Sequence, residues 1–325
     1  MENKPDKYIS ERGYTIKKSC LSKEEHNKIK KDLTVSPFTI KGYTNMPTPK
    51  FKVYLESKTK YYLPRFYGIS EFGKVCTNYL EELDHGESIC QNFHGQLKEI
   101  QVPIASKMIE ELKSTGGGIL NLHCGMGKTV LAIYIISQMK KKTLIIVHKE
   151  FLMNQWKERL NQFLPNAKVG IIQQNKVKVE NHDVVIAMLQ SVAMKSYERN
   201  IYESFGFTIV DEAHHISSQV FSRALPKIST RYMLGLSATL DRKDGLRRVF
   251  EWYLGKPTVC VQKMDIGEVV VNVVKLNDPQ YQVPFYNGNG KLNLAKLINT
   301  LVISPKRMKI ILDSVSYTHL RAHET

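Results

Sequence analysis

The chain has 325 residues, of which 42% are hydrophobic, so it is long enough for two domains and too apolar to be disordered over most of its length. The formal net charge of +16 favours a polyanionic partner, with nucleic acid the commonest candidate, although a solvated lysine-rich surface gives the same total. Five cysteines lie far apart without a C-x-x-C pair, and no apolar run approaches the roughly 18 residues of a membrane span, which argues against a zinc site, a disulfide framework and a transmembrane protein.

The first 90 residues predict a small basic α+β module. A lysine-rich helical pattern covers residues 21–33, and short aromatic and β-branched runs follow at residues 51–56 and 61–68. The basic and aromatic side chains could hold nucleic acid by phosphate contacts and stacking. Tyrosines at strand spacing could equally belong to a core, and the sequence leaves both readings open.

Residues 91–261 have a different texture, typical of an α/β fold with a parallel sheet. A helix is predicted over residues 102–114, and short apolar strands then alternate with amphipathic helices. The predicted strands are residues 117–123, 142–148, 183–189, 207–212 and 232–239. Largely apolar strands separated by helices indicate a sheet that is covered on both faces.

The remaining residues predict the start of another domain. In residues 262–314, a strand-like run at 268–276 precedes a loose connector and a helical pattern at 294–314. Residues 315–325 can be back-translated into the transposon-end adapter used in tagmentation libraries. We therefore expect residues 315–325 to be an adapter artefact, and the domain that begins before them to be cut short.

A candidate phosphate loop follows the first of these strands. Gly125, Met126 and Gly127 stand between residues 117–121 and an apolar helical run, so their backbone N–H groups are expected to surround phosphates at a helix N-terminus. Lys128 would reach the β- and γ-phosphates and Thr129 would ligate Mg²⁺. The full G-x-x-x-x-G-K-[ST] pattern requires a glycine where this chain has Leu122, and a glycine turn with an incidental lysine is the alternative.

An acidic pair about eighty residues later supplies the second half of a nucleotide site. Asp211 and Glu212 lie at the end of the predicted strand at residues 207–212, and the carboxyl ends of parallel strands share one crevice. Asp211 would hold Mg²⁺ through its water shell, and Glu212 would orient and deprotonate the water that attacks the γ-phosphate. Alone, such a pair more commonly caps a helix.

The two histidines after this pair do not predict a metal site. Adjacent residues do not share a helix face as an i, i+4 pair would. We expect His214 instead to link the nucleotide site to Ser237 and Thr239 by hydrogen bonds.

These motifs, in this order, resemble motifs I, II and III of superfamily 2 helicases. They are residues 124–129, 211–215 and 236–245, and the last extends as in the XPB-type branch and in helicases of nucleocytoplasmic large DNA viruses, including the poxvirus transcript-release helicase. Residues 147–156 and 186–192 are similar to motif Ia and to the segment that grips the strand backbone. The resemblance covers roughly Phe93 to Leu254.

The resemblance implies a RecA-like P-loop NTPase lobe, with a second RecA-like lobe truncated. It implies ATP and Mg²⁺ as cofactors and Gln101 near the adenine, although Lys98 and Ile100 replace the family's usual arginine and tyrosine. Lys149, Gln190 and Ser191 become candidates for contacts to strand phosphates. Lys149 could instead be a surface charge, and the other two could cap the following helix.

The expected function is that of an ATP-dependent helicase or translocase, acting on DNA in preference to RNA, in viral transcription or repair. The alternatives are a non-catalytic nucleic-acid-binding or regulatory protein on the same fold, and the motor part of a restriction-type nuclease. We expect a soluble, intracellular protein of the host cytoplasm or nucleus, or of the virion. Because the second lobe would supply the arginines that stabilise the transferring phosphate, residues 1–314 alone are expected to hydrolyse ATP poorly.

Overall fold

The structure is a computed structural model that describes most of the chain. The described residues are 5–36, 50–123, 125–198, 200–212, 218–228, 230–238, 247–261, 273–276, 284–290 and 292–321. Two compact units, Met1–Met264 and Asp265–Thr325, make up the chain. Within the described ranges, no helix is both long enough and apolar enough to cross a membrane.

The first unit begins with a small antiparallel sheet and two helices. The sheet has the strand order β1-β2-β6-β5, and β3 pairs with β4 beside it. The elements are β1 (Lys7–Ser10), β2 (Gly13–Lys17), the 3-10 turn Lys18–Cys20, α1 (Lys23–Asp32), β3 (Thr34–Val35), β4 (Phe51–Lys52), β5 (Leu55–Glu56), β6 (Lys60–Leu63), α2 (Arg65–Phe72) and the 3-10 turn Tyr79–Glu82. A capping box starts α1, because the Ser22 hydroxyl accepts from the Glu25 N–H while the Glu25 carboxylate accepts from the Ser22 N–H.

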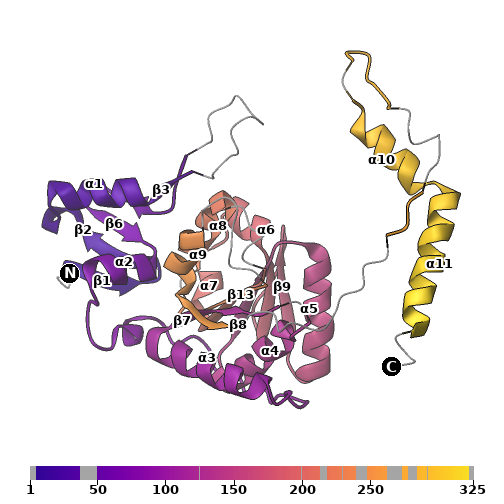
Figure 1. The fold of residues 1–325 in the computed structure, drawn as a ribbon. Coiled ribbons are helices and arrows are strands. Elements are labelled where there is room, and N and C mark those ends of the chain that lie inside the picture. The colour runs from indigo at the N-terminus through magenta and orange to yellow at the C-terminus, as the bar shows by residue number, and fades with distance from the viewer. Residues whose placement is uncertain are drawn as a thin grey trace. The chain divides into compact units, whose positions relative to one another are not determined.

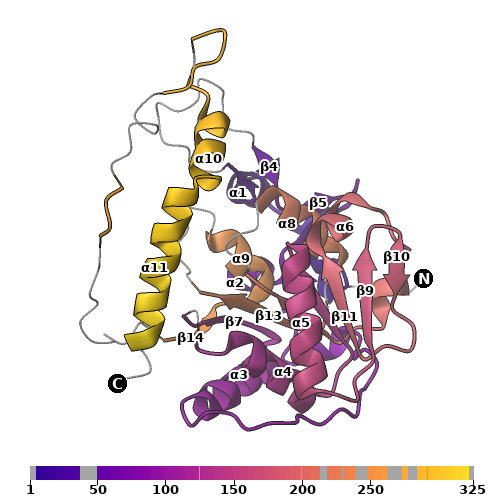
Figure 2. The ribbon, with the colours of Figure 1, turned by 90° about the vertical axis from the view of Figure 1, so that its right-hand side faces the viewer.

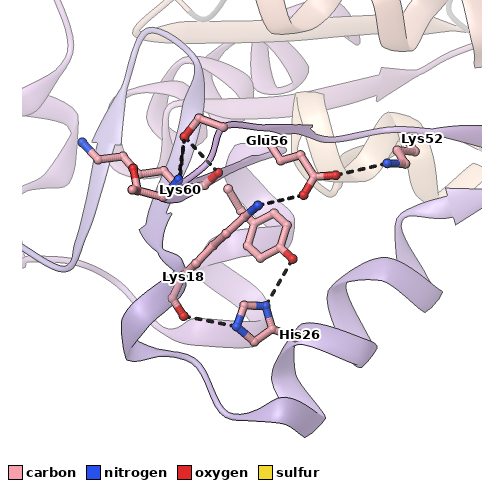
Figure 3. Close-up of polar contacts among 8 residues, drawn as sticks. Lys18, His26, Lys52, Glu56 and Lys60 are labelled. Carbon is pink, nitrogen blue, oxygen red and sulfur yellow. Dashed lines mark hydrogen bonds and ion pairs between the residues drawn. The ribbon is translucent and has the colours of Figure 1, made fainter.

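Tyrosines of this N-terminal part form its core, and lysines lie over their rings. Tyr54 and Tyr61 are buried. The Lys18 ammonium lies 4.6 Å from the Tyr61 ring centroid, and Glu56 binds both Lys18 (2.9 Å) and Lys52 (3.1 Å), as Figure 3 shows. These two rings belong to the core, which is the second of the two alternatives that the sequence left open. A nucleobase cannot stack on a ring that the protein covers.

An eight-stranded sheet forms the centre of the first unit (Figure 1). Its order is β10-β9-β11-β8-β12-β13-β7-β14, and every pairing is parallel except that of β10 with β9. The strands are β7 (Gly117–Asn121), β8 (Thr143–Val147), β9 (Val169–Gln173), β10 (Lys176–Lys178), β11 (Val184–Met188), β12 (Phe207–Val210), β13 (Tyr232–Ser237) and β14 (Pro257–Cys260). This mostly parallel α/β sheet confirms the predicted RecA-like lobe.

Helices cover both faces of the sheet, as its apolar strands require (Figure 1, Figure 2). One face packs against α3 (Gln101–Thr115), α4 (Lys128–Met139) and α5 (Glu150–Phe163). The other face packs against the N-terminal part and the remaining helices: α6 (Leu189–Met194), α7 (Asn200–Glu203), α8 (Ser218–Ala224), the 3-10 turn Leu225–Lys227 and α9 (Arg247–Leu254). Alternation along β8 illustrates the arrangement, since Ile145 belongs to the first core and Ile146 to the second.

The predicted helix at residues 102–114 and the five predicted strands are confirmed, with shorter strands than expected. Three strands, β9, β10 and β14, escaped the sequence analysis. In β9, a Cβ added at Gly170 would stand 2.1 Å from the Lys178 carbonyl oxygen. Glycine is therefore required there by the close approach of the backbone of β10. A strand whose pattern contains glycine carries a weaker apolar signal.

In the described part of the second unit there are two helices, α10 (Leu294–Val302) and α11 (Pro305–Arg321). The single helical pattern predicted at residues 294–314 is interrupted because Pro305 cannot continue the preceding helix. Of the predicted strand at residues 268–276, the structure describes only 273–276, and these four residues belong to no strand. The helix α11 runs through the boundary predicted at Ser314. A helix does not test the adapter interpretation of residues 315–325, which stays a prediction.

Candidate nucleotide site

The candidate phosphate loop leaves the sheet at the end of β7. The Leu122 N–H donates to the Ser237 carbonyl oxygen over 3.0 Å, so the ladder between β7 and β13 continues one residue beyond the strand. The Leu122 side chain is fully buried in the core beneath α3, α4 and α5. Leucine replaces the expected glycine because this position still belongs to the buried end of the strand.

Two glycines give the loop its path. Gly125 and Gly127 have φ values of +85° and +77°, in the left-handed region that favours glycine. A Cβ added at Gly125 would have nothing within 4 Å, so there is open space above the loop. Among the described residues no side-chain cap is found for α4, whose N-cap is Gly127, a residue without a side chain, and the N–H groups at a helix N-terminus attract anions. These features fit a phosphate group.

Two side chains hold the loop from either end. The Lys128 ammonium donates to the Leu122 carbonyl oxygen over 3.1 Å. The Gln101 amide donates to the Met126 carbonyl oxygen over 2.9 Å and accepts from the Lys98 N–H over 2.9 Å. Gln101 is buried, and its amide joins the loop to the start of α3, so the adenine contact implied by the resemblance remains a prediction.

The acidic pair follows β12 at the same edge of the sheet. Asp211 is 6% exposed; its Oδ1 accepts from the Glu212 N–H over 2.9 Å and its Oδ2 from the Trp156 indole N–H over 2.7 Å. Glu212 has a φ of +49°, an uncommon conformation for a residue with a side chain. Such conformations cluster at functional sites.

The pKa of Asp211 records what surrounds its carboxyl group. Burial raises this pKa from 3.8 to about 6 and the nearby Glu212 charge adds to the rise, while the Trp156 hydrogen bond and the charge of Lys128 lower it. Lys128 therefore lies close enough to Asp211 for their charges to interact. Since β13 alone separates β7 from β12, the phosphate loop and the acidic pair share one edge of the sheet.

The raised pKa gives a prediction for the protein without nucleotide and metal. Relative to Asp211→Asn, which has no carboxyl group to titrate, the wild type is expected to lose roughly 1–3 kcal/mol of its free energy of unfolding between about pH 4 and about pH 7. Between 3.8 and about 6 the folded chain binds a proton that the unfolded chain has lost, so wild-type stability falls as the pH rises through this window. Asparagine has one acceptor oxygen for the two donors that contact Asp211, so the change of stability with pH is compared, and not the two stabilities at one pH. Thermal unfolding in EDTA should find that the stability of the variant minus that of the wild type grows between about pH 4 and about pH 7. A difference that stays constant or shrinks would contradict this reading.

A metal ion would be held by residues from both halves of the site. Thr129 is half-buried in the first turn of α4, and Asp211 is the buried carboxyl group beside Lys128. A hydroxyl and a carboxylate are oxygen donors of the kind that Mg²⁺ prefers. The donor set therefore fits this ion, while the roles of both residues as ligands stay predictions.

The residues predicted to contact a nucleic-acid strand lie just beyond the ends of two neighbouring β-strands. Lys149 and Gln190 lie just beyond Val147 and Met188, which are paired in the ladder between β8 and β11, and both side chains are exposed. Ser191 is different, because its buried hydroxyl accepts from the Gln174 N–H over 2.9 Å. Ser191 thus holds the turn between β9 and β10. Of the three candidates, only Lys149 and Gln190 have exposed side chains that a nucleic-acid strand could contact.

Part of the predicted coupling network lies outside the described residues. His214 and Thr239 belong to this part, and their expected hydrogen bonds stay predictions. Ser237 is described as the buried last residue of β13.

Trp156 is the residue of this site that the sequence analysis did not assign. Its only available signal was its place at the end of the motif Ia segment, on a helix, with no spacing that links it to Asp211. The hydrogen bond between them spans 55 positions of the chain and depends on how α5 packs on the sheet.

The lobe is similar to proteins of known families. The sequence profile described as "Type III restriction enzyme, res subunit" matches residues 94–242. A protein of Acanthamoeba polyphaga mimivirus, provisionally named an ATP-dependent RNA helicase, is 34% identical over 323 residues, which cover 96% of this chain and 61% of that protein. A helicase so named from Invertebrate iridescent virus 6 is 32% identical over 70% of this chain and 52% of its own length. The chain thus spans little more than half of these relatives.

A solved structure agrees at the level of the fold. The UvsW helicase of bacteriophage T4 superposes with a TM-score of 0.52 over 77% of this chain and 98% of its own chain. At 14% sequence identity, this similarity supports the RecA-like architecture alone.

Proposed function

Because the chain is of the superfamily 2 helicase type and resembles the helicases of nucleocytoplasmic large DNA viruses, we propose that it is the ATP-binding part of a nucleic-acid motor. The protein would hydrolyse ATP with Mg²⁺ and use the free energy to move along a strand, in viral transcription or repair. One observation carries the proposal: a glycine loop that leads into a helix N-terminus lies at the same edge of the sheet as the buried carboxyl group of Asp211.

Each residue of this edge has a proposed task. The backbone of Gly125, Met126 and Gly127 would bind the phosphates, and the Lys128 ammonium would neutralise their charge. Thr129 and Asp211 would hold Mg²⁺, which stabilises negative charge on the phosphates when it is bound.

Glu212 would remove the proton of the attacking water. The Glu212 backbone has an uncommon conformation and its N–H donates to the buried Asp211 carboxyl group, so the side chain starts from a fixed point beside the metal-binding residue, as a base that must be oriented requires.

The nucleic-acid strand would lie along the carboxyl ends of β8 and β11. The exposed side chains of Lys149 and Gln190 support contacts to phosphates, which predict binding that is independent of base sequence and sensitive to salt. We propose DNA as the strand, on the resemblance of residues 236–245 to the XPB-type branch. The name of the mimivirus relative mentions RNA, so DNA and RNA must be compared directly.

Nucleotide binding by residues 1–325 tests the site. We expect the wild-type chain to bind a non-hydrolysable ATP analogue with Mg²⁺ at one site, and Lys128→Ala to weaken binding at least about tenfold, because the phosphates lose a cation. Isothermal titration calorimetry measures both affinities. Lys140→Ala is the matched control, since Lys140 lies at the opposite end of α4. Equal affinities of wild type and Lys128→Ala would show that Lys128 does not bind the phosphates.

A further inference from the structure

The Trp156 side chain is buried in the lobe, yet its one polar atom is directed at the acidic pair. The ring is 1% exposed, on α5, in the core shared with β8 and β11. Its indole N–H donates to Asp211 Oδ2 over 2.7 Å, while Asp211 Oδ1 accepts from the Glu212 N–H over 2.9 Å. Both oxygens of the buried carboxyl group are therefore held, one by the backbone and one by a side chain from another element.

This arrangement restricts Asp211 more than burial alone would. A backbone N–H on one oxygen allows the carboxyl group to rotate about its own axis, whereas a second donor on the other oxygen fixes the plane of the group. The second donor is itself fixed, because α5 packs against β8 and β11 and leaves the indole ring no exposed surface. A ring locked by packing can transmit its orientation to the carboxyl group.

We propose that Trp156 is a positioning residue, which holds the Asp211 carboxyl group in the orientation that binds the magnesium–nucleotide complex. The inference rests on the proposed function, in which Asp211 holds Mg²⁺. Hydrogen bonds to a carboxylate that ligates a metal orient it and commonly change metal affinity about 10–100-fold when they are removed.

A plainer role for the same bond makes a different prediction. Buried tryptophans usually find an acceptor for their N–H, and this bond would then matter to folding alone. Such a role would change the stability of the protein and leave its affinity for Mg²⁺ unaffected. The two roles separate when nucleotide binding is measured with and without the metal.

The test uses the full-length protein with Trp156 replaced by 3-benzothienylalanine, which keeps the shape of the ring and has sulfur in place of the N–H. Trp156→Phe is the second variant. Trp252→Phe is the control, because Trp252 is the other tryptophan of the chain. It is half-buried on α9, and its ring centroid lies 5.3 Å from that of Tyr67 in an edge-on contact. Calorimetry with a non-hydrolysable ATP analogue gives the affinity in EDTA and in Mg²⁺.

We expect the affinity in EDTA to be unchanged in all variants, since the phosphate loop and Lys128 are intact. The gain in affinity on adding Mg²⁺ should fall about 10–100-fold in both Trp156 variants and stay at the wild-type value in Trp252→Phe. A wild-type gain in the benzothienylalanine protein would overturn the proposal. If Trp156→Phe does not fold, the isosteric variant decides the question by itself.

Asp211→Asn separates this inference from the proposed function. If Asp211→Asn loses the gain and the Trp156 variants keep it, the positioning role fails and the metal role of Asp211 stands. If Asp211→Asn also keeps the gain, the metal role of Asp211 fails, and the positioning role fails with it.

Discussion

Replacing Arg65 with methionine is expected to lower the free energy of unfolding by roughly 3–4 kcal/mol. Arg65 begins α2 and is 3% exposed. Its guanidinium donates to the carbonyl oxygens of Thr230 (3.1 Å), Arg231 (3.0 Å) and Gly116 (2.7 Å). Burial lowers its pKa to about 10, so it stays charged near neutral pH and its hydrogen bonds are charge-assisted.

The size of this effect follows from where the carbonyl groups lie. Gly116 follows α3 and precedes β7, and Arg231 precedes β13, so one side chain of the N-terminal part fastens two entry points of the central sheet. Methionine keeps much of the volume but supplies no donor, and it removes the charge-assisted donors from the three buried carbonyl groups.

Urea unfolding of the first unit, followed by fluorescence, measures the loss in free energy of unfolding. Arg159→Met is the matched control. Arg159 is exposed on α5 and donates a hydrogen bond to Gln162, so its replacement should change stability by less than about 0.5 kcal/mol. A loss for Arg65→Met no larger than that for Arg159→Met would show that the three bonds do not hold the two parts together.

Glu212→Gln is expected to reduce ATP turnover by the full-length protein about a hundredfold or more, because glutamine keeps the shape of the side chain and cannot accept the proton of the attacking water. Affinity for a non-hydrolysable ATP analogue should stay within about threefold of wild type, since the loop and Lys128 are unaltered. Steady-state phosphate release gives the first quantity and calorimetry the second.

The control for this substitution is Glu203→Gln, an exposed carboxyl group on α7. Its turnover should match that of the wild type. Wild-type turnover in Glu212→Gln would mean that another group accepts the proton, whereas a parallel loss of nucleotide affinity would mean that Glu212 supports binding and not the chemical step.

The central sheet could be predicted where strands are continuous apolar runs. The run at residues 143–147 is buried along its whole length, and a strand covered on both faces needs such a run. β14 gave no such signal, because Pro257 begins it and one of its four residues is exposed. The interruption of the C-terminal helical pattern was visible in the sequence as Pro305 and was not used.

The candidate site was predictable as far as local sequence determines it. Strand, loop and helix order placed Gly125 to Lys128, and the end of an apolar strand placed Asp211 and Glu212, because backbone geometry at these points depends on neighbours in the chain. Partners distant in the sequence were not predictable. The bond from Trp156 to Asp211 and the contact of Gln101 with the loop depend on helix packing, which no spacing encodes.

Ser191 shows the same limit from the other side. Its segment was correctly placed at a strand end, but the turn that buries its hydroxyl belongs to β9 and β10, two strands that the sequence analysis missed.

Strand-stimulated ATP hydrolysis by the full-length protein tests the proposed function most directly. Phosphate release is measured without nucleic acid, with single- and double-stranded DNA and with RNA of the same sequence, at two salt concentrations, for wild type and Lys128→Ala. We expect hydrolysis by the wild type that DNA stimulates more than RNA does, that is weaker at high salt, and that Lys128→Ala abolishes. Hydrolysis that no strand stimulates, or that persists in Lys128→Ala, would contradict it.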